Sequence, residues 1–142
     1  MPKKLWADVD IEKLAEEVIG RNGKFHIMVS FMGIATLPAI LMDRNGRLLY
    51  MNKRAEDHWK VRTKNVIGQP WPRILCLNEK DTARMAKESK AVLAANEARV
   101  FVEWFSEGTK LAHLQSVLKF PFKDDDDDTL LGVFVLPHNT GQ

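Results

Sequence analysis

The dipeptide Asn45-Gly46, which stands between two apolar runs, constrains the fold of this chain more than any other feature of the sequence. Asn and Gly both tolerate the positive φ angles of a tight turn, so this pair is a strong short-range signal of a β-hairpin. The flanking runs, residues 37–43 and 47–52, are therefore expected to pair as antiparallel strands.

The rest of the chain supplies three more apolar runs and several helical segments. Residues 99–105 and 110–120 flank the turn sequence Ser-Glu-Gly-Thr, and residues 130–136 form the last run. The spacing of apolar residues and the cap signals predict helices over residues 11–19, 25–35, 53–60 and 79–95. Strands at both ends of a helical middle indicate an α+β fold, with one antiparallel sheet and helices packed on it.

The composition is that of one ordinary globular domain. The chain has 142 residues, and its single cysteine, Cys76, excludes an internal disulfide framework, which fits a reducing, cytoplasmic compartment. The formal net charge of +2 is too small to indicate nucleic acid binding. The N-terminus lacks the features of a signal peptide.

Two segments invite a membrane or a metal interpretation, and we favour neither. Residues 25–42 are apolar, but polar residues and Pro38 interrupt them, so a buried helix that runs into a strand is expected instead. The run Asp124 to Asp128 is expected to be a protruding hairpin loop. Consecutive aspartates on a strand end point to opposite sides and do not converge on one ion.

The ordered set of motifs resembles the PAS family over residues 37–140. The matching single residues are Asp43, Gly46, Asn52, Ala55 and Glu56, followed by the pairs Ile67-Gly68 and Phe120-Pro121. The resemblance implies a five-stranded antiparallel sheet with helices on one face, enclosing a ligand cavity. Residues 1–36 would then be an N-terminal cap of amphipathic helices or a dimerisation segment, and residues 37–140 the PAS sensor domain. At the exit, His138-Asn139-Thr140 replaces the Asp-Ile-Thr that is common in the family.

PAS domains carry different cofactors, and the residues here argue against two of them. A reactive flavin-binding cysteine would be expected where Trp71 stands, and Cys76 is interpreted as a small buried apolar residue. The predicted helix over residues 79–95 contains no histidine, so haem is not expected. The cofactor stays unknown. A small organic ligand or a non-covalent flavin stacked on Trp71, Trp104 or Phe101 is compatible with the sequence.

Strand alternation and the resemblance together predict the ligand site. His113, Gln115 and Val117 share one strand face, and comparison with PAS domains suggests that this face lines the cavity. Gln115 is expected to bond to the ligand, because the facing helix offers few hydroxyl partners. The expected lining residues are Trp71, Met85, Ser89, Phe101, Glu103, His113, Gln115, Val117, Phe134 and Leu136.

The same alternation leaves an apolar outer face on the sheet. In the last strand, Leu130, Gly132, Phe134 and Leu136 are expected to point inward, and Leu131, Val133 and Val135 outward. An apolar face of this kind is costly to expose, so the helix over residues 11–19 and the segment after it are expected to cover it, within the chain or across a dimer.

These features predict a sensory input domain of a bacterial regulator, such as a histidine kinase, a cyclase or a transcription factor. The domain would bind a small organic ligand or cofactor and form a homodimer, with an effector domain elsewhere in the full-length protein and no nucleic acid or membrane contact. The alternative is a dimerisation or docking module whose core is filled by side chains such as Met42, Met51 and Met85. No catalytic motif is recognisable, so the chain is not expected to be an enzyme.

Overall fold

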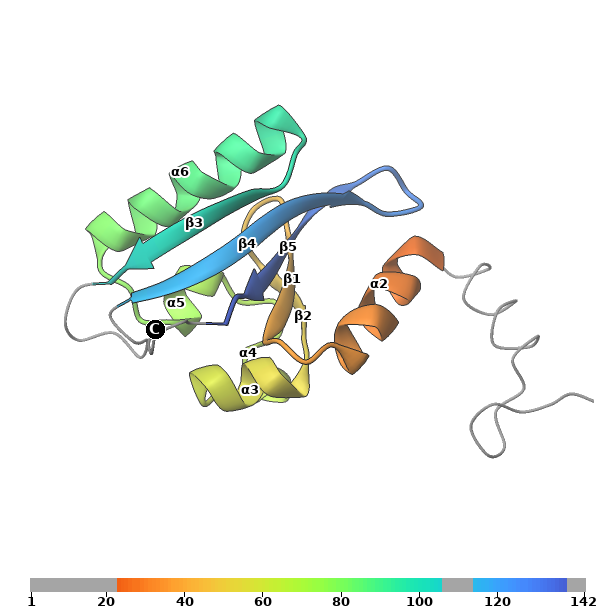
Figure 1. Ribbon diagram of the computed structural model, residues 1–142, viewed down its shortest axis with the longest axis horizontal. Coiled ribbons are helices and arrows are strands. Elements are labelled where there is room, and N and C mark those ends of the chain that lie inside the picture. Colours follow the sequence, from red (N-terminus) through yellow and green to blue (C-terminus); the bar gives the residue numbers. More distant parts are fainter. Residues whose placement is uncertain (1–22, 106–113, 138–142) are drawn as a thin grey trace, which may run out of the picture.

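A computed structural model of the chain describes residues 23–105 and 114–137 and shows one sheet with helices on both faces (Figure 1). Five antiparallel strands lie in the order β2-β1-β5-β4-β3. The elements are α2 (Gly23–Ile34), β1 (Ala39–Asp43), β2 (Leu48–Met51), α3 (Lys53–Trp59), α4 (Thr63–Val66), α5 (Trp71–Ile74), α6 (Glu79–Ala95), β3 (Arg99–Trp104), β4 (Leu114–Lys123) and β5 (Thr129–Val135). The predicted α+β fold with a five-stranded sheet is confirmed.

The predicted hairpin joins β1 and β2, and Asp43 organises its turn. The Asp43 carboxylate accepts hydrogen bonds from the backbone N–H groups of Asn45 (2.8 Å) and Arg47 (2.9 Å). Gly46 has a φ of +85°, whereas Asn45 is not in the left-handed region. Only the glycine therefore needs its special backbone freedom in this turn.

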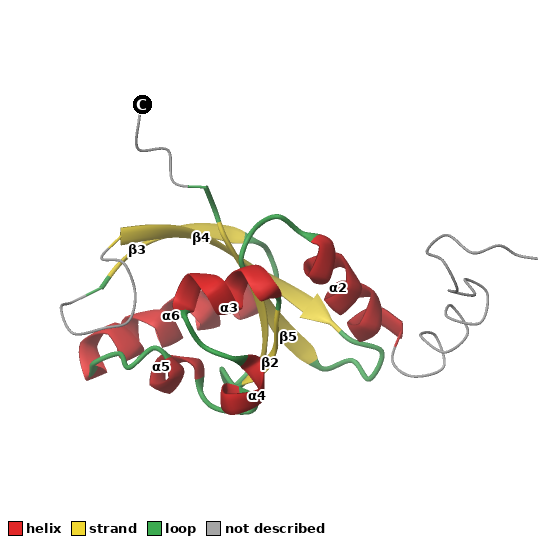
Figure 2. Cartoon of the chain, turned by 90° about the horizontal axis from the view of Figure 1, so that it is seen from below, coloured by secondary structure: helices red, strands yellow, loops and turns green. Residues whose placement is uncertain are grey.

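The inner face of the sheet packs against α3 to α6, which lie together on one side of it (Figure 2). This core contains Trp59, Trp71, Met85 and Val92 from the helices. Its strand residues include Ile40, Met42, Val117, Leu131, Val133 and Val135.

The expected sidedness of the last strand is wrong. Val135 pairs with Val117, and directly paired residues on neighbouring strands point to the same face. Leu131, Val133 and Val135 are thus inside, whereas Leu130 and Phe134 belong to the outer cluster. Gly132 also lies on the outer side, where a Cβ atom would come within 2.2 Å of Cζ of Phe120.

Helix α2 covers part of the outer face within the same chain. Phe25, Met28, Val29 and Met32 of this helix pack with Ala39, Leu41, Phe120 and Phe134 of the sheet. Helix α2, which follows residues 11–19 in the sequence, therefore covers the outer face as expected. Residues 11–19 themselves lie outside the described residues. Among the described residues, no helix has the length and apolar character needed to span a membrane.

The acidic run forms the loop between β4 and β5, as predicted. Asp124 is buried, and its carboxylate accepts the backbone N–H groups of Asp126 (3.0 Å) and Asp128 (2.9 Å). Asp125 accepts the backbone N–H of Lys24 in the first turn of α2 (3.3 Å). These aspartates thus shape the turn and contact α2. Within residues 23–105 and 114–137, no three metal-ligating side chains gather.

The side chain of Asn52 connects α2, β1 and α3. Its Oδ1 accepts the backbone N–H groups of Ala39 (3.0 Å) and Ala55 (2.9 Å), the second of which caps α3. Its Nδ2 donates to the carbonyl oxygens of Met32 (2.8 Å) and Leu37 (2.9 Å). Asn52 is only 2% exposed, so these four hydrogen bonds replace contacts that water would otherwise supply.

We expect Asn52→Ala to lower the free energy of unfolding by about 3 kcal/mol or more, because it leaves several buried backbone groups unpaired. The matched control is Asn78→Ala, which removes a single capping bond to Asp81 at the start of α6 and should cost about 1 kcal/mol. Urea unfolding of both variants measures the difference. Equal losses would show that Asn52 acts as a helix cap and no more.

Candidate functional site

A hollow of about 260 Å³ lies between the β1–β2 turn, α5 and α6. Three side chains of its inner wall, Met42, Trp71 and Met85, are almost fully buried. The complete lining is Met42, Arg44, Asn45, Gly46, Trp71, Pro72, Met85, Ala86, Ser89, Lys90 and Leu93. The volume is slightly below the range of about 300–1,000 Å³ that is typical of ligand pockets, so the hollow suits a small molecule.

A backbone hydrogen bond holds two walls of the hollow together. The N–H of Trp71 donates to the carbonyl oxygen of Gly46 (2.8 Å), which ties α5 to the hairpin turn. The Trp71 ring also packs edge-on against Trp59, with ring centroids 4.8 Å apart. This contact holds the indole ring in place. The two walls are therefore formed in advance of any ligand.

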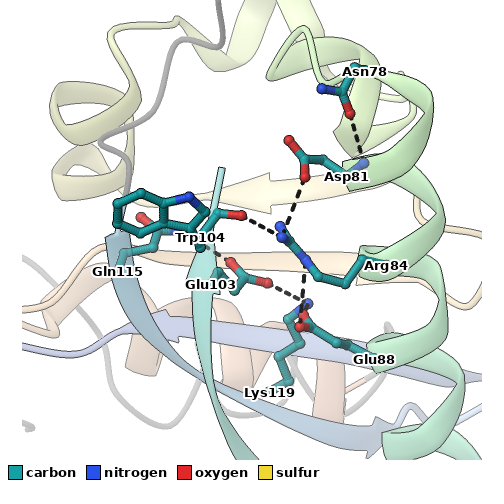
Figure 3. A network of polar contacts seen from close by, with 8 residues as sticks. All are labelled: Asn78, Asp81, Arg84, Glu88, Glu103, Trp104, Gln115 and Lys119. Atoms are coloured by element: carbon teal, nitrogen blue, oxygen red, sulfur yellow. Dashed lines mark hydrogen bonds and ion pairs between the residues drawn. The ribbon is translucent and has the colours of Figure 1, made fainter. Parts of the chain in front are cut away.

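The third wall, α6, is joined to the sheet by a buried charged cluster (Figure 3). The Lys119 ammonium on β4 lies 3.0 Å from Oε1 of Glu88 on α6 and 3.0 Å from Oε2 of Glu103 on β3. The Lys119 and Glu103 side chains are 3% and 2% exposed, and that of Glu88 is 12% exposed. One cation is thus shared by two carboxylates in a nearly dry environment. We call Lys119, Glu88 and Glu103 the buried charge triad.

Polar side chains extend the triad in two directions (Figure 3). On one side, Nε2 of Gln115 donates to Oε1 of Glu103 (3.2 Å), and Oε1 of Gln115 lies 3.3 Å from Nε2 of His58. On the other side, the Arg84 guanidinium pairs with Asp81 (3.3 Å) and donates to the carbonyl oxygen of Trp104. The network therefore links α6 to both β3 and β4.

Burial and the neighbouring polar groups shift the pKa values of Glu88 and Glu103 in opposite directions. Burial, together with the hydrogen bond to Glu103, raises the pKa of Glu88 to about 7. Burial alone would also raise the pKa of Glu103, but the Lys119 charge and the hydrogen bonds from Glu88, Lys119 and Gln115 lower it. Below a pH of about 7, the two carboxyls therefore hold one proton between them, and the raised pKa of Glu88 places it on that side of the pair.

The structure separates the predicted site residues into three groups. Trp71, Met85 and Ser89 line the hollow together. Val117, Phe101, Glu103 and Gln115 face the same side of the sheet but belong to its core and to the polar network. Phe134 lies on the outer face, stacked on Phe120, and Leu136 lies near the end of α2 beside Phe31 and Leu118. His113 is outside the described residues.

The expectation that Gln115 needs a ligand partner is wrong. Its amide already bonds to Glu103 and His58, which come from a neighbouring strand and from α3. Neither Glu103 nor His58 lies on the facing helix, whose hydroxyl groups were the partners expected from the sequence. Gln115 and Leu136 do line a second hollow of about 370 Å³, but it lies at the strand ends and not between the sheet and α6.

Sequence reasoning also missed Lys119 and misplaced Cys76. Alternation from Gln115 through Val117 puts Lys119 on the inner face, so this signal was present in the sequence. Cys76 is exposed, contrary to the predicted burial, and has a φ of 58° in the turn after α5.

Comparison with known proteins identifies the fold. The sequence profile described as PAS fold matches residues 35–141. The PAS domain of BvgS from Bordetella pertussis is similar at a TM-score of 0.67 and 16% identity, over 84% of this chain and 90% of that one. No curated protein matches the sequence.

Two further structures extend this comparison. The PAS domain of the quorum-sensing receptor RpfR from Cronobacter turicensis, in complex with BDSF, has a TM-score of 0.52 and 14% identity, over 70% of this chain and 92% of that one. The histidine kinase ThkA, in complex with the response regulator TrrA, has a TM-score of 0.56 and 17% identity, over 78% of this chain and 31% of that one.

The buried charge triad makes the free energy of unfolding depend on pH. An unfolded Glu88 has the ordinary pKa of 4.5, and the folded one has a pKa of about 7, so the folded state binds more protons between these values. The free energy of unfolding should therefore fall by about 1–2 kcal/mol as the pH rises from 5 to 8. This fall is smaller than the free energy that corresponds to the whole pKa shift, because water reaches part of the Glu88 side chain and screens its interactions. Glu103 affects the free energy of unfolding in a lower pH range: it stabilises the fold while it is ionised, and this stabilisation is lost as the pH falls through its lowered pKa.

Glu88→Gln imitates the protonated carboxyl and should remove this fall. The variant should match the parent near pH 5 and be the more stable protein at pH 8, as measured by urea unfolding. Glu97→Gln, at an exposed position that precedes β3, should keep the parent's pH dependence. If Glu88→Gln kept the whole dependence, the proton would belong to another group.

Proposed function

Because the chain belongs to the PAS family, we propose that it is the sensory input domain of a larger signalling protein and binds a small organic ligand between α6 and the β1–β2 turn. The hollow lined by Trp71, Met85 and Ser89 carries this proposal. Its inner wall is apolar, and Asn45 and Ser89 supply hydrogen-bonding groups at its sides, which is the usual composition of a ligand pocket.

The similar structures support the proposal at the level of the family. The RpfR domain, which comes from a quorum-sensing receptor, was determined in complex with BDSF, and ThkA is a histidine kinase determined in complex with a response regulator. By analogy, the effector of the present domain is a kinase, a cyclase or a DNA-binding domain in the full-length protein. In this proposal the domain acts in the cytoplasm by binding and carries no catalysis of its own.

The proposal includes a homodimer formed through the part of the outer face that α2 leaves uncovered. On β3, Val100, Val102 and Trp104 are 59%, 65% and 60% exposed, and Leu114 beside them on β4 is 40% exposed. Phe31 and Ile34 on α2 are 55% and 82% exposed. Exposed apolar surface of this kind is costly in water, and a second copy of the chain would bury it.

A docking module without a ligand is the second candidate, and the filled core favours it. Met42, Met51 and Met85 are at most 5% exposed and fill the space under the sheet, as methionines do in irregular cores. In that case the hollow at α6 would have no occupant, and the outer face alone would carry the function.

A substitution that fills the hollow separates the two candidates. Ser89→Phe places a ring between α6 and the turn and should weaken ligand binding by at least about tenfold, since the ring and the ligand would compete for the same space. Binding is measured by thermal shift with a panel of small organic compounds, and Ala83→Phe, exposed on the same helix, is the control. In a ligand-free docking module, Ser89→Phe would instead raise the free energy of unfolding by about 0.5–2 kcal/mol and change no binding.

A charge on the outer face tests the dimer. Val102→Lys should weaken self-association by about tenfold or more, because it puts two like charges in the apolar contact. Light scattering across a concentration series measures the mass, and Lys87→Glu on α6, on the other side of the sheet, is the control. A monomeric parent protein, or a Val102→Lys variant with unchanged mass, would contradict the proposed interface.

A further inference from the structure

The rim of the hollow carries two basic side chains on facing walls. Arg44 comes from the hairpin turn and Lys90 from α6, and no acidic residue is among the lining residues. In the part of the chain that the structure describes, neither of the two forms an ion pair. Two cations therefore border one small cavity, and the described residues supply no counter-ion to either of them.

The neighbouring acidic groups are engaged elsewhere. The Asp43 carboxylate accepts the two backbone N–H groups of the turn, and Glu88, two residues before Lys90, faces Lys119 inside the triad. A third basic residue of the hairpin, Arg47, donates to the carbonyl oxygen of Gly68. The positive character of the rim is thus not cancelled by the acidic groups nearest to it in the sequence.

We propose that the ligand of this hollow is a small amphipathic carboxylate, with its apolar body against Trp71 and Met85 and its carboxylate between Arg44 and Lys90. This inference rests on the proposed ligand-binding function and specifies its ligand class. Charge-assisted hydrogen bonds from a guanidinium and an ammonium are the strongest polar contacts that such a rim can make. Asn45 and Ser89 can orient the same group by neutral hydrogen bonds.

The size of the hollow and its apolar inner wall limit the class of ligand further. The volume of about 260 Å³ corresponds to roughly nine water molecules at about 30 Å³ each, which fits a body of about ten heavy atoms. Met42, Trp71, Met85 and Leu93 offer such a body apolar and aromatic contacts. A nucleotide would need more space and more polar partners than these walls supply.

The experiment compares two ligands of nearly equal shape that differ in charge. The full chain is titrated calorimetrically with 3-phenylpropanoate and with 3-phenylpropanamide. We expect the carboxylate to bind about tenfold more tightly, the equivalent of two partly exposed ion pairs, and its advantage to shrink at high salt.

Variants at the rim locate the source of the preference. Lys90→Gln and Arg44→Gln should each reduce the carboxylate's advantage by about threefold, and the double variant should abolish it. Lys87→Gln, exposed on the same helix and outside the hollow, should keep the full advantage. Thermal unfolding checks that the variants are folded.

The outcomes separate this inference from the proposed function. Equal affinities for acid and amide, both lost in Ser89→Phe, would overturn the carboxylate inference and leave the ligand-binding proposal intact. A carboxylate advantage that survives in the double variant would likewise overturn it. The absence of binding by either compound at millimolar concentration would overturn both the inference and the use of this hollow as a ligand site.

Discussion

The four hydrogen bonds of the Asn52 carboxamide determine how the chain passes from one face of the sheet to the other. They join the end of α2 on the outer face, the start of β1 in the sheet and the start of α3 on the inner face. A single buried amide can do this because it offers two donors and an acceptor with two lone pairs. The positions of both helical layers relative to β1 depend on this side chain, which explains why it is buried although it is polar.

The second constraint is the single ammonium of Lys119 between two carboxylates. A buried ion pair contributes little net stability, but removing one partner leaves an uncompensated charge, so the triad fixes the register of α6 against β3 and β4. The same helix carries Met85, Ser89 and Lys90 on its side toward the turn. The shape of the hollow therefore depends on how the triad positions α6 against the sheet. Because Glu88 belongs to α6, its protonation acts directly on the helix that forms the third wall.

The sequence was sufficient to predict where the helices and strands lie, but not which face of every strand is buried. Local signals located the hairpin and both ends of α6, since turn residues and caps act within a few positions. In β5, apolar residues stand on both faces, so no polar residue marked which face is inner. The register with β4 decides which face of β5 is buried, and this register is a long-range property.

The partner of Gln115 was missed for a related reason, because Glu103 comes from a neighbouring strand and not from the facing helix. At Cys76, apolar neighbours suggested burial, but the positive φ of the turn accompanies an exposed side chain.

The burial of the strands shows where the sheet has one cover and where it has two. β1 has four successive buried residues because α2 lies on one side of it and the inner core on the other. β3 has buried Glu103 on its inner face, whereas Val100, Val102 and Trp104 on its outer face are 59%, 65% and 60% exposed. The proposed ligand site and the proposed dimer surface therefore lie on opposite faces of one sheet. Glu103 on β3 and Lys119 on β4 lie on the inner face of these strands, and Lys119 also bonds to Glu88 on α6, so these contacts physically connect the strands of the dimer surface to the helix that lines the ligand site.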